Sequence, residues 1–123
     1  MGRLRQVAEN EAKGKAAELY KGIRAKLGKV PNVHQAMAVN PGFLEAMLKL
    51  AAAAGKGLDM KTKELINIAV SSVNNCQYCL DAHVVIAKMH GATDAEIHAA
   101  VECAAAMSAF NVFNHGTNPE IDF

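Results

Sequence analysis

The residues best suited to chemistry lie in one short segment of the chain. Cys76 and Cys79 are separated by two residues, and His83 follows Cys79 by four. On a helix, positions three, four and seven apart share one face, so we expect the two thiols and the imidazole to line up. A thiolate attacks disulfides and peroxides, and a second cysteine within reach then closes a disulfide with it. The spacing therefore predicts a redox site.

The surroundings of the two cysteines predict how their protons are handled. Cys76 falls in the first turn of the expected helix, where unpaired backbone N–H groups and the helix dipole favour a thiolate. His83 can accept the proton of Cys79 or stabilise its thiolate. Glu64 lies on the preceding expected helix, which must turn back at Asn74-Asn75 and pack alongside. Its carboxylate could reach His83 directly or through a water, set the imidazole tautomer and raise its basicity.

A zinc site is the main alternative for the same residues, in a non-catalytic zinc-binding or scaffold module. Cys76, Cys79 and His83 are typical zinc ligands, and Glu64 could supply the fourth. However, three of these ligands would lie along one helix, which its own hydrogen bonds already hold. A thioredoxin-like protein is disfavoured because its Cys-x-x-Cys motif follows a strand, and the sequence predicts no strand. We therefore expect a thiol site with no bound metal.

The rest of the chain predicts an all-α fold of about six helices. Alanine is the commonest residue, tryptophan is absent, and no long stretch alternates apolar and polar residues as a strand would. Glycine, proline and asparagine residues mark the breaks between helices. The expected helices are Glu9–Lys26, Asn32–Val39, Gly42–Ala54, Met60–Val73, a fifth from about Cys76 to Met89, and a sixth that a Thr93–Glu96 capping box begins and that reaches about Phe113.

Length and charge restrict the classes of function. The 123 residues fit a single domain over 1–123, and a composition of 51% hydrophobic and 20% charged residues is that of a folded protein. A net charge of +1 gives no basic excess for nucleic acid or an anionic membrane. No apolar run approaches the ~20 residues of a membrane span, and the first residues lack the apolar segment of a secretory signal. We expect a cytoplasmic protein with no nucleic-acid or membrane partner.

The last expected helix is apolar on almost every side. Between Ile97 and Phe113 its only charged residue is Glu102, whereas a surface helix of a small monomer should carry a polar stripe. Either it is a central core helix, or one face meets the core and the other a second subunit. We expect a homo-oligomer. Cys103 is expected to be a small buried residue, and His115 either caps this helix or enters a site from a neighbouring subunit.

The order Glu64, eleven residues, Cys76, two residues, Cys79, three residues, His83 extends into a wider pattern. The flanking sequence reads NCQYCLDAH, followed by a GAT turn at 91–93 and by Glu-Ile at 96–97. This pattern resembles the alkylhydroperoxidase D-like (AhpD-like) branch of the carboxymuconolactone decarboxylase family, over about residues 60–100. The resemblance implies an all-α AhpD-like helical bundle with the Cys-x-x-Cys motif at the N-terminus of the fifth helix. It also implies assembly as trimers or hexamers.

The resemblance further implies roles for individual residues. Cys79 would attack the peroxide, Cys76 would close the disulfide, and His83 with Glu64 would relay protons. The substrate would be a hydroperoxide, or a disulfide if the protein is a disulfide reductase with the same site. No cofactor would be bound, and an external dithiol, such as a lipoyl group or a small redox protein, would act as reductant. The best-known peroxidase members place a histidine where this chain has Tyr78, which can donate a hydrogen bond but is a poor base near neutral pH. The family's lactone-decarboxylating branch needs no cysteine pair, so the pair counts against that activity.

Overall fold

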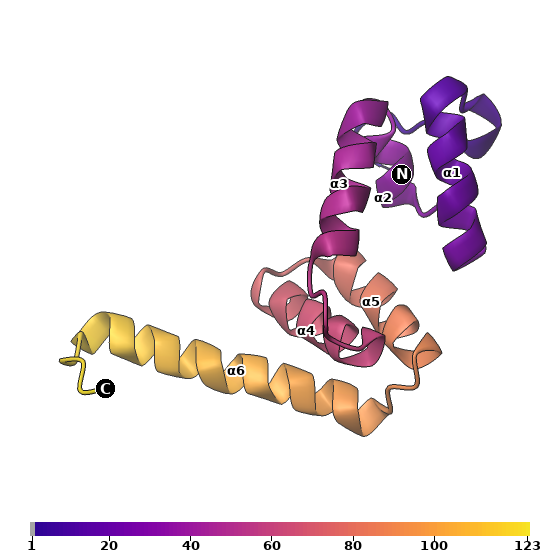
Figure 1. The fold of residues 1–123 in the computed structure, drawn as a ribbon. Coiled ribbons are helices and arrows are strands. Elements are labelled where there is room, and N and C mark those ends of the chain that lie inside the picture. The colour runs from indigo at the N-terminus through magenta and orange to yellow at the C-terminus, as the bar shows by residue number, and fades with distance from the viewer. Residues whose placement is uncertain (1) are drawn as a thin grey trace. The chain divides into compact units, whose positions relative to one another are not determined.

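The chain is helical throughout the part that the structure describes. The structure is a computed structural model, and it describes residues 2–123, which contain six α-helices, one short 3-10 helix and no strand. The all-α prediction is confirmed. The helices form two compact units, one ending at Lys56 and the other beginning at Gly57 (Figure 1). One domain over 1–123 stays a prediction.

The first unit packs its helices around a small apolar core. Its elements are η1 (Glu9–Glu11), α1 (Gly14–Leu27), α2 (Asn32–Met37) and α3 (Pro41–Ala53). The buried core residues are Ala16, Tyr20, Ile23, Val30, Ala38 and Leu44. The hydroxyl of Tyr20 donates a hydrogen bond to the Val7 carbonyl at 2.7 Å. The polar end of this buried ring therefore has a partner, as burial requires.

The start of the first helix differs from the prediction. We expected a continuous helix from Glu9, but a single 3-10 turn ends at Glu11 and α1 begins only at Gly14, where φ is +54°. Instead of continuing the helix, Glu9 folds back on α1, and the Arg24 Nε donates to its carboxylate at 2.9 Å. The end agrees with the prediction, because Gly28 adopts a left-handed φ of +74° and its N–H donates to the Arg24 carbonyl.

In the second unit, one central helix packs against the two others. The elements are α4 (Met60–Val73), α5 (Gln77–Met89) and α6 (Asp94–Thr117), and α4 packs against α5 and against α6 (Figure 1). Ile68 and Ala87 are fully buried in its core. Burying a side chain such as Ile68 contributes roughly 2 to 3 kcal/mol to stability. This packing is what fixes α5 beside α4.

Local sequence signals set the ends of these helices. The Asp59 carboxylate accepts the Thr62 N–H at 2.8 Å, and Thr93 with Glu96 forms the expected capping box before α6. The predicted bounds of α4 and α5 hold within a residue. The α6 helix continues about one turn past Phe113, to Thr117, and the left-handed Asn118 caps it. His115 is therefore not the cap.

The α6 helix is the least covered element of the second unit. Ala104 is its buried residue, and from 105 to 117 every residue except Ser108 is exposed. The exposed large side chains are Val101, Met107, Phe110, Val112 and Phe113. The central-core alternative for this helix is therefore wrong, and Cys103, which we expected to be buried, is exposed. None of the helices in the described part of the chain combines the length and the apolar character that crossing a membrane requires.

Candidate active site

The predicted site residues lie on two helices that pack directly together. Glu64 belongs to the buried face of α4, while Cys79 and His83 lie on the first two turns of α5. Cys76 is the residue immediately before α5. The second unit thus brings the four residues to one helix pair, as their spacing predicts.

A specific turn between α4 and α5 places Cys76. Asn75 follows the end of α4 in the left-handed conformation, with φ at +56°, a conformation that asparagine tolerates better than most residues. The Asn75 N–H donates to the Ser72 carbonyl at 3.4 Å, and the Cys76 N–H donates to the Ser71 carbonyl at 3.0 Å. This pair of bonds is a Schellman motif, which satisfies the last carbonyls of α4. The chain then enters α5 with Cys76 at its start.

Glu64 and His83 form a direct contact. The Nδ1 of His83 and the Oε2 of Glu64 are 2.5 Å apart, and the two side chains are 28% and 6% exposed. An ionised carboxylate only accepts hydrogen bonds, so the Nδ1 must carry the hydrogen. The opposite nitrogen, Nε2, is then the atom of His83 that can take up or release a proton. The expected partnership of these two residues is therefore made without an intervening water.

The two thiols interact with each other. The side chain of Cys79 hydrogen-bonds to the Cys76 sulfur, and the backbone N–H of Cys79 does so as well. Together these bonds hold the pKa of Cys76 below its usual value, against a smaller opposing effect of burial. Both cysteines are free and half-buried.

The pKa of Cys79 is shifted in the opposite direction, above its usual value. Its hydrogen bond to Cys76 raises its pKa, and burial and the charge of Cys76 raise it further, whereas a hydrogen bond with the Ser71 side chain lowers it. Their shared hydrogen bond therefore shifts the pKa values of the two thiols in opposite directions, and the thiols titrate as a pair.

Sequence reasoning missed one residue at this site, Ser71. It lies on the same face of α4 as Glu64 and Ile68, at spacings of seven and three residues, and all three are buried. Its side chain hydrogen-bonds to Cys79, and its carbonyl accepts the Cys76 N–H. The only signal in the sequence was a serine at a core position of a helix, seven residues after an acid at another.

The two predicted supporting residues, Tyr78 and His115, are both exposed. Tyr78 precedes Cys79, and its side chain is 44% exposed. His115 lies in the exposed last turn of α6. The helix rises roughly 16 Å between Ala104, where it is buried, and His115. Within this chain, His115 is carried away from the packed part of α6, and a role in a neighbouring subunit stays a prediction.

The residues proposed as zinc ligands are not grouped, in the described part of the chain, as a metal site would require. Among residues 2–123, no three histidine, cysteine, aspartate or glutamate side chains are grouped so that they could hold a metal ion. The closest contacts of the proposed ligands are instead with each other in pairs, Glu64 with His83 and Cys76 with Cys79. These side chains are therefore arranged as two hydrogen-bonded pairs.

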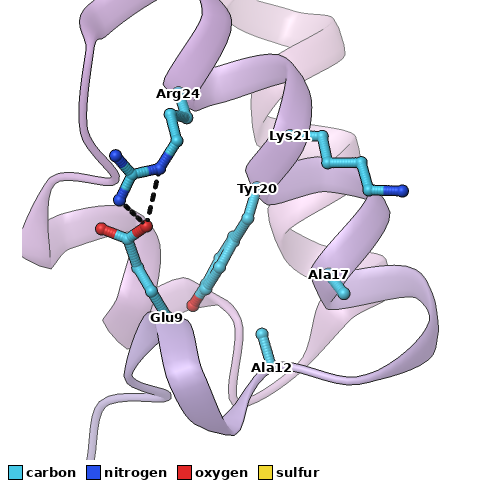
Figure 2. Close-up of a pocket in the computed structure, with 6 residues that line it drawn as sticks. All are labelled: Glu9, Ala12, Ala17, Tyr20, Lys21 and Arg24. Carbon is cyan, nitrogen blue, oxygen red and sulfur yellow. Dashed lines mark hydrogen bonds and ion pairs between the residues drawn. The ribbon is translucent and has the colours of Figure 1, made fainter.

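A pocket of about 170 Å³ lies in the first unit and includes none of the predicted site residues. Figure 2 shows the six residues that line it, which are Glu9, Ala12, Ala17, Tyr20, Lys21 and Arg24. The charged groups of Arg24 and Glu9 bind each other at its edge, and Lys21 is paired with Glu18. Its polar groups hold the chain together, and we assign it no chemistry.

The chain is similar to known proteins over most of its length. The family model described as "Carboxymuconolactone decarboxylase family" matches residues 41–119. The chain is 35% identical to "Alkyl hydroperoxide reductase AhpD" of Maricaulis maris over 77 residues, which are 63% of this chain and 44% of that protein. It is 38% identical to "Uncharacterized protein 4 in cox locus" of Paracoccus denitrificans over 78 residues, covering 63% of this chain and 68% of that protein.

A solved structure extends the likeness to the whole fold. The crystal structure of the alkylhydroperoxidase AhpD core from Rhodospirillum rubrum matches with a TM-score of 0.90 at 26% identity. The match covers 99% of this chain and 95% of that one. By contrast, the match to the Maricaulis maris protein spans less than half of that protein's length.

Proposed function

Since the chain belongs to the carboxymuconolactone decarboxylase family, and several of its relatives are named alkyl hydroperoxide reductases, we propose that it reduces organic hydroperoxides with its thiols. The observation that carries this proposal is the pairing of the Cys76 and Cys79 thiols on the helix that also holds His83 against the buried Glu64. A peroxidase needs a thiolate, a second thiol and a proton donor, and this helix pair supplies each of them.

The proposed reaction takes two electrons from the two thiols. The Cys79 thiolate attacks one peroxide oxygen, an S–O bond forms, the O–O bond breaks, and the departing alkoxide takes a proton to become the alcohol. The Cys76 thiolate then attacks the Cys79 sulfur, an S–S bond forms, and the hydroxide that leaves becomes water with a second proton. His83, through its Nε2, accepts and returns these protons, while Glu64 orients the ring and stabilises its charged form.

The lowered pKa of Cys76 is compatible with attack by Cys79. Thiolate nucleophilicity falls as the thiol pKa falls, so the thiol with the higher pKa gives the more reactive anion. The pair shares its protons through a hydrogen bond, and transfer of one proton from Cys79 to Cys76 moves the charge to the attacking sulfur. In the second step the low pKa of Cys76 favours the thiolate that must close the disulfide.

The first test adds one equivalent of cumene hydroperoxide to the reduced protein. A Cys103→Ser protein is used, so that the only thiols are those of Cys76 and Cys79. We expect both thiols to disappear within seconds, with an intact mass that has lost two hydrogens and gained no oxygen. Thiols that survive this treatment would contradict the peroxidase proposal.

A second candidate function, disulfide reduction, is favoured by the low pKa of Cys76. In such an enzyme Cys76 would attack an external disulfide and Cys79 would release the product by closing the internal one. The two functions differ in which variant still takes the first step. With oxidised lipoamide, Cys79→Ser would trap a mixed disulfide on Cys76. With hydroperoxide, Cys76→Ser would instead trap a sulfenic acid on Cys79.

We also propose that the enzyme is a homo-oligomer, a trimer or a hexamer. The exposed apolar side chains of α6 support this, because a surface of that kind is usually covered by another chain. Phe110 and Phe113 are 62% and 68% exposed. A Phe110→Glu, Phe113→Glu protein should elute at monomer mass in light scattering. An unchanged mass would place the interface elsewhere, and a monomeric parent protein would contradict the proposal.

The return of electrons completes the proposed cycle. An external dithiol, a lipoyl group or a small redox protein, would attack the Cys76–Cys79 disulfide and restore both thiols. A reducing compartment such as the cytoplasm suits this cycle, because thiols persist there. Turnover with dihydrolipoamide as the only reductant is the direct assay.

A further inference from the structure

Ser71 makes two separate contacts with the cysteine pair. We propose that Ser71 is a positioning residue of the thiol site, whose hydroxyl holds the Cys79 sulfur while its backbone carbonyl anchors Cys76 at the start of α5. This inference rests on the proposed thiol function and adds a residue of α4 to it. It also gives the turn between α4 and α5 a part in the chemistry.

The first support is the distribution of buried polar side chains. Glu64 and Ser71, at 5% and 9% exposure, are the buried polar residues of the described chain. They are seven residues apart on α4, so they lie two turns apart on one face. Glu64 contacts His83, and Ser71 contacts Cys79. Buried polar groups are retained where they have hydrogen-bond partners, and here both partners belong to the α5 site.

The second support is the backbone geometry. The Ser71 carbonyl belongs to the last turn of α4, where carbonyls have no partner within the helix. It accepts the Cys76 N–H at 3.0 Å across the turn at Asn75. One residue therefore fixes Cys76 through its main chain and Cys79 through its side chain. The relative placement of the two sulfurs depends on both contacts.

The third support is the electrostatic balance at Cys79. Cys76 and burial both oppose a charge on Cys79, and the Ser71 hydroxyl acts in the other direction. The buried acid of α4, Glu64, is bound to His83 of α5. The α6 residue in this core cluster is the uncharged Ile97, and the nearby Glu96 is paired with Lys61 of α4. Ser71 is thus the group that offsets the pull of Cys76.

The test measures Cys79 alone. In a Cys76→Ser, Cys103→Ser protein, Cys79 is the sole cysteine, and its rate of alkylation by iodoacetamide is followed against pH. Adding Ser71→Ala should raise the midpoint of this rate–pH profile by about one pH unit, because a hydrogen bond to the Cys79 thiolate is lost. The matched control is Ser72→Ala, since the Ser72 hydroxyl bonds to the Ile68 carbonyl of its own helix.

Two outcomes would overturn the inference. One is an unchanged midpoint in the Ser71→Ala protein, and the other is an equal shift in the Ser72→Ala protein. Alanine is a strong helix former, so α4 should persist, and circular dichroism verifies this. Because no hydroperoxide is used, the assay separates the two proposals. Suppose that the thiols resist hydroperoxide but the alkylation midpoint of Cys79 still shifts in Ser71→Ala. The peroxidase proposal would then be rejected, and the proposed role of Ser71 would stand.

A second readout uses the complete cysteine pair. At neutral pH, a rise of about one unit leaves roughly tenfold less Cys79 thiolate, while the remaining thiolate becomes more nucleophilic, so the net slowing is about threefold. Stopped-flow oxidation of Ser71→Ala by cumene hydroperoxide should show this slowing, and the deficit should shrink as the pH rises. A loss of the same size at every pH would indicate a purely structural defect and would contradict the electrostatic role.

Discussion

Each unit contains a carboxylate beside a basic side chain, and the two pairs differ in what they can do. Glu9 and Arg24 of the first unit lie near the surface, with side chains 33% and 55% exposed. Glu64 and His83 of the second are 6% and 28% exposed. A guanidinium does not release its proton at any ordinary pH, whereas an imidazole changes charge near neutrality. Of the two basic side chains, the imidazole is the one whose chemistry suits proton transfer.

The neighbours of the two pairs lead to the same conclusion. Arg24 also donates to the Gly28 carbonyl at 3.3 Å, so it links the Glu9 carboxylate to the backbone at the end of α1. Beside Glu64 and His83 on the α4–α5 pair stand two free thiols. Similar charged groups therefore hold the chain together in one unit and accompany reactive groups in the other. Burial and the chemistry of the neighbours, more than the presence of a charge pair, distinguish a site from a structural contact.

The largest effect should come from the attacking thiol. Cys79→Ser should abolish hydroperoxide turnover, because serine is not ionised near neutral pH and cannot form the sulfenic acid. Cys103→Ser, on the exposed side of α6, should leave turnover unchanged. The measurement is the steady-state rate with cumene hydroperoxide and dihydrolipoamide. Full activity in Cys79→Ser would show that the roles of the two cysteines are wrongly assigned.

The next test compares the two pairs directly. Glu64→Gln keeps an oxygen that can accept the Nδ1 hydrogen of His83 but removes the charge, and we expect kcat/KM to fall on the order of 100-fold. Glu9→Gln should leave kcat/KM unchanged. Equal losses in both variants would mean that the comparison between the pairs does not hold, and that both act through overall stability.

How far the sequence predicts this molecule depends on how local each feature is. The resemblance carried by Glu64, Cys76, Cys79 and His83 is confirmed at the level of the family. Helix ends set by neighbouring residues, such as the Thr93–Glu96 capping box, are also correct. The residue roles themselves stay predictions. A motif can be recognised because the spacing of its residues is read directly from the sequence, without knowledge of the fold.

The features that escaped prediction depend on contacts between distant segments. The break between Glu11 and Gly14 accompanies the contact of Glu9 with Arg24, fifteen residues further along. The contact of Ser71 with Cys79 follows from the packing of α4 on α5. Neither can be inferred from helix propensity or from the spacing of a motif.

A smaller effect is expected where this chain departs from the best-known peroxidases. Tyr78→His would place a second imidazole next to Cys79, and we expect the rate of thiol oxidation by hydroperoxide to rise roughly tenfold at neutral pH. Tyr78→Phe is the control, because it changes the side chain without adding a base. A rate that does not rise in Tyr78→His would indicate that His83 already supplies the proton transfer that limits the reaction.

The smallest effect should come from the surface pair. The hydrogen bond from Arg24, helped by the Val30 N–H, holds the pKa of Glu9 below its usual value. The native carboxylate therefore contributes stability above its unfolded pKa and loses it as the pH falls through the native one. Glu9→Gln should lower Tm slightly at pH 7, with no difference from the parent protein well below about pH 4. The pair is solvent-exposed, so added salt should also reduce the difference at pH 7. Thermal unfolding followed by circular dichroism at both pH values tests this. A deficit that persists in acid would mean that Glu9 acts through packing, and the surface pair would then resemble the buried one more closely than its exposure suggests.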